Sequence, residues 1–220
     1  MIKLLIFDFD GTLADTRELI VETNLRSMRA LGLLEKEEGS ICATIGLPLV
    51  DGFLKMYPDI SADIIPEWVR TYRELFEQLK GQFVPGVFPH VKETLSNLQE
   101  RGFTLTVASS RKTSSLKEFL ENMGLAPFFS YVLGVDDVAH AKPHPEPVLK
   151  TLEGLGFAPD EAMVIGDMPV DIQMGLGAGV WTCGVSYGNA DRQQLLDAGA
   201  HYVIDDFGEL FEEPSPPRNR

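Results

Sequence analysis

The second half of the chain alternates short apolar runs with amphipathic segments, and this alternation restricts the fold more than any other feature. Apolar runs predict strands at residues 103–108, 130–134, 162–166, 180–185 and 202–204, with one more at Leu4-Leu5-Ile6. Apolar residues three or four apart predict helices marked by Val87–Leu98, Leu116–Met123 and Val148–Leu155. Strands that alternate with helices form a parallel sheet covered on both faces, so the sequence predicts a doubly wound α/β fold.

Residues 15–85 show a different pattern, with helical spacing and no strand candidate. Val21, Leu25 and Met28 mark a first helix, residues 47–56 a short element, and residues 61–80 a longer helix that ends at Gly81. We therefore expect a core of residues 1–14 and 86–213 with a helical insertion of residues 15–85. The Pro-rich end, residues 214–220, is expected to be a disordered tail.

Polar side chains follow several of the predicted strands. Asp8 and Asp10 come directly after the first strand, and alternation along an extended chain lets both face one site. Gly11 allows a tight turn or the close approach of an anion. Ligands of such sheets bind beyond the carboxyl ends of the strands, and the insertion at residue 15 would lie over that place. Two neighbouring carboxylates require a cation or a shared proton, which suits a metal site with a nucleophile and a proton carrier.

Bulk composition restricts the partners. The 220 residues are 44% hydrophobic, which is enough for a full core. Nineteen basic and 33 acidic side chains give a net charge of −14, which argues against nucleic acid or an anionic membrane as partner. An acidic site would repel an anionic substrate unless a divalent cation were bound, so the acidity itself favours metal dependence. Cys42 and Cys183 form no metal or redox pattern and are expected to be reduced thiols.

The sequence contains no signal-peptide pattern and no apolar run that approaches the roughly 18 residues of a membrane span, so we expect a soluble, cytoplasmic protein. A monomer and a homodimer both remain open.

Three further segments follow the first acidic pair in a fixed order. They are Thr106-Val107-Ala108-Ser109-Ser110-Arg111, Ala141-Lys142-Pro143-His144-Pro145, and Val164-Ile165-Gly166-Asp167-Met168-Pro169-Val170-Asp171. Together with Asp8-Phe9-Asp10-Gly11 they resemble the four motifs of the haloacid dehalogenase-like hydrolase superfamily, in its phosphatase branch. The resemblance extends from Ile2 to about Leu210 and implies a Rossmann-like core with a helical cap that opens and closes.

The resemblance also implies a role for each matching residue. Asp8 would be the nucleophile that forms an aspartyl phosphate, and Asp10 would donate and later accept the proton. A magnesium ion (Mg²⁺) would be bound by Asp8, the backbone carbonyl of Asp10, and Asp167. Asp171 would orient Lys142 or a metal-bound water, and Lys142 would neutralise the transferring phosphoryl group.

Further residues are expected to bind the substrate. Ser109 would hydrogen-bond a phosphate oxygen, helped by the backbone N–H groups of Gly11 and Ser110. For Arg111, a phosphate contact and a solvent-facing pair with an acid are equally compatible with the sequence. The apolar loop around Gly46 would contact the substrate from the cap.

Several residues differ from those of other branches of the family, and these differences restrict the activity that we expect. Asp10 argues against dehalogenases and phosphonate-cleaving members, which lack this acid. Ile20, Ile45 and Leu49 stand where the related sugar-phosphate mutases carry polar or basic residues, so mutase activity is disfavoured. A small phosphate monoester, phosphoglycolate-like, is the favoured substrate, and inorganic pyrophosphate is the alternative. A non-catalytic module that binds a phospho-ligand is disfavoured because Asp8, Asp10, Lys142 and Asp167 are all present.

Overall fold

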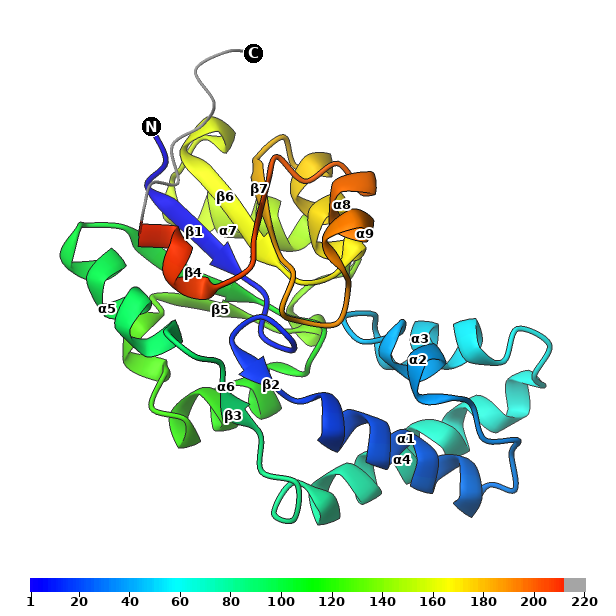
Figure 1. The fold of residues 1–220 in the computed structure, drawn as a ribbon. Helices are drawn as coiled ribbons and strands as arrows, with labels where there is room; N and C mark the ends of the chain where they lie inside the picture. Colours follow the sequence, from blue (N-terminus) through cyan, green and yellow to red (C-terminus); the bar gives the residue numbers. More distant parts are fainter. Residues whose placement is uncertain (212–220) are drawn as a thin grey trace.

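A six-stranded parallel sheet forms the centre of the molecule in the computed structural model, which describes residues 1–211 (Figure 1). The strand order is β5-β4-β1-β6-β7-β8. The strands are β1 (Leu4–Phe7), β4 (Thr104–Ala108), β5 (Tyr131–Leu133), β6 (Ala162–Gly166), β7 (Trp181–Val185) and β8 (Tyr202–Ile204). Every predicted strand is present and the predicted doubly wound α/β fold is confirmed. The expected tail, residues 214–220, lies outside the described residues.

Helices cover both faces of the sheet because consecutive residues of the buried strands point in opposite directions. In β1, Leu5 and Phe7 pack with α5 (Val91–Glu100) and α6 (Thr113–Asn122), whereas Leu4 and Ile6 pack with α7 (Glu146–Leu155) and α8 (Pro169–Gly177). The helix α9 (Arg192–Asp197) packs beside α8. Within residues 1–211 there are also five short 3₁₀ turns: η1 (Ala62–Ile64), η2 (Ala126–Phe128), η3 (Val135–Asp137), η4 (Pro159–Glu161) and η5 (Phe207–Phe211).

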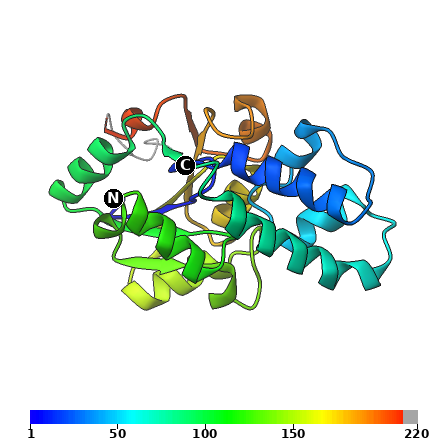
Figure 2. The same cartoon turned by 90° about the horizontal axis from the view of Figure 1, so that it is seen from below.

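The helices α1 (Arg17–Ala30), α2 (Glu38–Cys42), α3 (Leu49–Met56) and α4 (Ile65–Leu79) form a separate layer beyond the end of the sheet, which we call the helical unit (Figures 1 and 2). It has an apolar cluster of its own in which Trp68 is fully buried and stacks on Phe53, with ring centroids 4.3 Å apart. The carboxyl end of β1 points toward this unit, and the N-terminus lies at the opposite end of the sheet (Figure 1).

Three local expectations were wrong. The short antiparallel ribbon of β2 (Ala14–Asp15) and β3 (Gly86–Val87) was missed, because two-residue strands carry no periodicity. Val87 belongs to this ribbon and not to the following helix, which begins at Val91. The helix α2 forms between the expected first helix and residues 47–56, where no element was expected.

The described residues contain no helix that is both long and apolar enough to cross a membrane.

Candidate active site

The first acidic pair lies at the carboxyl end of β1, in the middle of the sheet. The Asp8 N–H donates to the Ile165 carbonyl at 2.8 Å, so the ladder with β6 continues one residue past the strand. Both carboxyl groups are buried. Gly11 then turns the chain with φ +85°, and a Cβ atom there would overlap the Asp167 carboxylate. Glycine is therefore required at this position for two reasons, the positive φ and the lack of room for a Cβ atom beside Asp167.

Lys142 lies between two carboxylates in the interior. Its Nζ is 2.5 Å from Asp8 Oδ1 and 2.7 Å from Asp171 Oδ1, and all three side chains are at most 2% exposed. Burial alone would lower the pKa of Lys142, but Asp171 and Asp8 outweigh it and raise that pKa above its ordinary value. The lysine is thus a permanent cation within reach of whatever Asp8 binds.

Asp171 is held rigidly from the first turn of α8. Its Oδ2 accepts the Met168 N–H at 3.0 Å, which places the carboxylate at the N-terminus of that helix. Gly166 is needed beneath it, because a Cβ there would overlap the Asp171 side chain. The structure therefore places Asp171 where the sequence expected it, directed at Lys142.

Asp167 is fully buried and receives three hydrogen bonds. Thr12 Oγ1 donates to Oδ1 at 3.2 Å, and the backbone and side-chain N–H groups of Asn189 both donate to Oδ2 at 2.8 Å. Burial and the nearby Asp171 raise the pKa of Asp167 from 3.8 to about 7, although the Asn189 bonds oppose this shift. Sequence reasoning missed Thr12 and Asn189. The signal for Asn189 was its place in the polar segment after the strand at 180–185, at the same edge of the sheet.

The carboxylates could hold a metal ion. Asp8, Asp167 and Asp171 each offer an oxygen within 4.8 Å of the others. Asp8 Oδ2 is buried without a hydrogen-bond partner among the described residues, which is costly unless something binds there. Burial raises the pKa of Asp8 well above its usual range despite the adjacent Lys142, and a cation would reverse that effect. Oxygen-only ligands of this kind suit Mg²⁺, which the donor set therefore fits.

Asp10 does not share this cluster but faces Arg111. Arg111 Nε is 2.8 Å from Asp10 Oδ2 and Arg111 Nη2 is 2.6 Å from Asp10 Oδ1, a bidentate arrangement. Thr16 Oγ1 also donates to Oδ1, at 2.6 Å, from the ribbon that leads into α1. The Arg111 side chain is only 9% exposed, so of the two sequence readings the pairing with an acid is present, but in the interior and not facing solvent.

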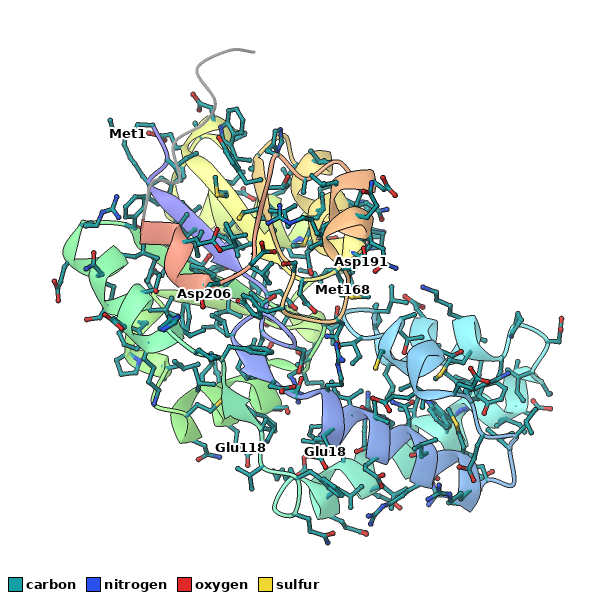
Figure 3. The ribbon with its side chains drawn as sticks, viewed as in Figure 1. Met1, Glu18, Glu118, Met168, Asp191 and Asp206 are labelled. Atoms are coloured by element: carbon teal, nitrogen blue, oxygen red, sulfur yellow. The ribbon has the colours of Figure 1, made fainter. Side chains whose placement is uncertain are left out.

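The serine pair after β4 contacts both parts of the molecule. Ser109 Oγ, buried at the strand end, accepts the Arg111 N–H at 3.2 Å. Ser110 Oγ donates to the Gly46 carbonyl at 2.5 Å, so the loop between α2 and α3 rests on the core. Gly46 has φ +89° and sits against Met168, the residue before α8, which Figure 3 shows at the side of the core facing the helical unit.

A cavity of about 550 Å³ separates the helical unit from the core. Asp10 and Arg111 line it from the core side. The rest of the wall is largely apolar and includes Ile20, Thr44, Ile45, Leu47, Val69 and Phe76 of the helical unit. Most residues named from the sequence as catalytic or substrate-binding thus lie at the carboxyl ends of β1, β4 and β6 or in the Gly46 loop beside them. Lys142 reaches Asp8 from the loop between η3 and α7, which follows the edge strand β5.

Comparisons with known proteins agree with this geometry. The family model described as haloacid dehalogenase-like hydrolase matches residues 5–185. "Probable phosphatase IndB" of Dickeya dadantii is 38% identical over 96% of this chain and 92% of its own length. "Pyrophosphatase PpaX" of Oceanobacillus iheyensis is 35% identical over 96% and 95%. A solved haloacid dehalogenase-like hydrolase structure from Bacteroides fragilis superposes with a TM-score of 0.90 at 28% identity, over 96% of this chain and all of that one.

Proposed function

This chain belongs to the haloacid dehalogenase-like hydrolase family, and on that premise we propose that it is a Mg²⁺-dependent phosphatase that forms an aspartyl phosphate on Asp8. The observation that carries the proposal is the state of Asp8. One of its oxygens is paired with Lys142, while the other is buried without a hydrogen-bond partner within residues 1–211, in a cluster with Asp167. A carboxylate held in this way is oriented for attack on a phosphoryl group.

The reaction would proceed in two displacements. In the first, an Asp8 oxygen bonds to phosphorus, the bond from phosphorus to the leaving oxygen breaks, and Asp10 gives its proton to that oxygen. In the second, Asp10 takes a proton from water, the water oxygen bonds to phosphorus, and the bond to Asp8 breaks. Lys142 neutralises charge on Asp8 and on the phosphoryl oxygens, and Ser109 hydrogen-bonds one of those oxygens.

Asp8, Asp167 and the carbonyl of Asp10 would hold the Mg²⁺ ion, with Asp171 orienting Lys142. The bound ion supplies positive charge that offsets both the carboxylates and the phosphoryl oxygens. Two residues that the sequence did not single out, Thr12 and Asn189, hold Asp167 in place for this purpose.

The helical unit, within residues 15–85, would act as a cap that closes over the site and selects the substrate. The apolar wall of the cavity favours a compact substrate, a small monoester such as phosphoglycolate. Inorganic pyrophosphate is the second candidate, because relatives that match almost the full chain, such as the one from Oceanobacillus iheyensis, are named pyrophosphatases.

A screen of phosphate release tests the proposal. Phosphoglycolate, pyrophosphate and an aryl phosphate are compared by kcat/KM with Mg²⁺ and with a chelator. Turnover should require the metal, and Asp8→Asn should lower it on the order of a thousandfold or more while the circular dichroism spectrum stays unchanged. If the activity of Asp8→Asn stayed within tenfold of the unmodified protein, Asp8 could not be the nucleophile. Full activity in chelator would show that the reaction does not depend on a metal ion.

A further inference from the structure

We propose that Arg111 recognises a second negative group on the substrate, next to the phosphoryl group that is transferred. In this structure Arg111 is paired with Asp10, and a carboxylate or a second phosphate on the leaving group would accept hydrogen bonds from its remaining donors. Arg111 would thus be the residue that determines specificity. This inference rests on the proposed phosphatase function and narrows it to compact phosphates that carry two anionic groups.

The surroundings of Arg111 fit a recognition residue. Its guanidinium lies over three aromatic rings, at 4.6 Å from the centroid of Phe119, 5.0 Å from Phe76 and 5.6 Å from Phe9. Phe76 belongs to the helical unit and the other two rings to the core, so the guanidinium is enclosed between the two parts. An arginine that is largely removed from water and fixed by stacked rings binds an anion with little loss of conformational entropy.

Arg111 has donors to spare. Asp10 engages Nε and Nη2, whereas Nη1 makes no hydrogen bond within residues 1–211. Guanidinium groups carry five N–H donors in a planar fork, which matches the two oxygens of a carboxylate or phosphate. Arg111 is one of the residues that line the 550 Å³ cavity, so an anion bound there would lie beside its side chain.

The charge of the cavity differs from that of the whole chain. Its wall carries Arg73, Lys112 and Arg111 against Asp10 and Glu77, one positive charge in excess, in a protein with a net charge of −14. The phosphoryl group itself would be bound elsewhere, by Lys142 and the Mg²⁺ site. The cationic excess of the cavity is therefore available to a different anionic group.

The position of Asp10 indicates where that second group must lie. Asp10 is the proposed proton donor to the leaving oxygen, so its immediate neighbour Arg111 lies on the leaving-group side. A carboxylate one carbon away from the ester oxygen, as in phosphoglycolate, fits this place. In pyrophosphate the leaving phosphate is itself the second anion. With a neutral leaving group of the same size, Arg111 would stay paired with Asp10 alone.

Matched substrate pairs test the inference. One pair is phosphoglycolate and its neutral carboxamide, and the other is pyrophosphate and methyl phosphate. The unmodified protein should favour the charged member of at least one pair, and which pair shows this separates a carboxylate from a phosphate as the second anion. Arg111→Gln should lower that ratio of kcat/KM about 10- to 100-fold, the effect of one charge-assisted hydrogen-bonded pair. Arg111→Lys keeps the positive charge but loses the planar pair of N–H donors, and it should recover part of the lost preference for the charged substrate.

Arg70→Gln is the control, since Arg70 lies on the same helix α4 but outside the cavity wall and pairs with Glu67 and Glu74 at the surface, and it should change the ratio less than about threefold. An equal loss on charged and neutral substrates in Arg111→Gln would mean that Arg111 only positions Asp10, and would overturn the inference. So would an unmodified protein without preference for the charged member of either pair.

A binding measurement separates this inference from the proposed function. Calorimetry on Asp8→Asn with Mg²⁺ compares phosphoglycolate with its carboxamide, and pyrophosphate with methyl phosphate, without any turnover. A preference for the charged ligand that disappears in the Asp8→Asn, Arg111→Gln double variant supports Arg111 as the recognition residue even if no phosphate is released from any substrate. Equal affinities for both members of each pair would refute it, whatever the activity.

Discussion

Replacing Lys142 with methionine removes the only cation that is close to Asp8 and Asp171 among the described residues. The side chain keeps its approximate length, but the carboxylates that it neutralised at 2.5 and 2.7 Å stay buried. Removing one partner of a buried ion pair costs about 3–5 kcal/mol, because the other charge is left uncompensated. For a chain of this length each kcal/mol lowers Tm by about 2–4 °C, so Tm should fall by roughly 6–20 °C.

The measurement is thermal and urea unfolding of Lys142→Met in the presence of chelator, followed by circular dichroism. Saturating Mg²⁺ should recover a large part of the loss, since the ion brings positive charge to the same carboxylates. Because the pKa of Asp8 is already raised by burial, and loss of Lys142 raises it further, protonation relieves the repulsion as pH falls. The loss of stability in Lys142→Met should therefore be larger at pH 8 than at pH 6.

Lys80 provides a matched control. It also pairs with two carboxylates, Glu77 at 2.6 Å and Glu118 at 2.7 Å, but at the surface, where both acids are about half exposed. Lys80→Met should cost at most about 1 kcal/mol, without dependence on Mg²⁺. Equal losses in the two variants, or a Lys142→Met protein as stable as the unmodified one in chelator, would show that the buried carboxylates do not need this lysine.

Three further results are expected. Burial and Asp171 raise the pKa of Asp167 from 3.8 to about 7. In chelator the folded protein therefore keeps the Asp167 proton at pH values where the unfolded chain has lost it. The contribution of Asp167 to the free energy of unfolding should decline as pH rises from about 4 through 7. The stabilisation by Mg²⁺, taken from urea midpoints, should accordingly grow over this range, and a slope that persists unchanged in Asp167→Asn would contradict the assignment. Gly11→Ala should weaken Mg²⁺ binding at least about tenfold in calorimetry, because the new Cβ would overlap Asp167, whereas Gly102→Ala, with the same φ of +85° and open space around it, should cost only about 1–2 kcal/mol of stability. Equal metal affinities in the two variants would refute the steric argument. Leu47→Gln, in the loop that borders the cavity, should change the order of kcat/KM among small phosphates and leave Mg²⁺ affinity within about twofold, and the reverse pattern would mean that the helical unit does not select the substrate.

The sequence by itself was sufficient to locate the strands of the core and to predict its doubly wound α/β class. The strand at 162–166 was located to the residue, because a strand buried on both faces is a continuous apolar run and needs no tertiary information to be recognised. The strand at 202–204 was also located to the residue, although it is a half-buried edge strand. The order of the polar residues at the strand ends placed Asp8, Asp10, Ser109 and Asp167 at one edge, since parallel strands all end there. Local chemistry also indicated the turn at Gly11.

Only the tertiary structure decided which of these groups face one another. The pairing of Arg111 with Asp10 joins residues 101 positions apart, and the pairing of Lys142 with Asp8 joins residues 134 apart. The bonds from Asn189 and Thr12 to Asp167, and from Ser110 to the Gly46 carbonyl, likewise depend on how loops pack after the sheet has formed. Periodicity reports which face of an element is buried, but it carries no information on the partner across a loop. The sequence therefore determined which residues reach the site, and packing determined that Asp8 is paired with a lysine and Asp10 with an arginine.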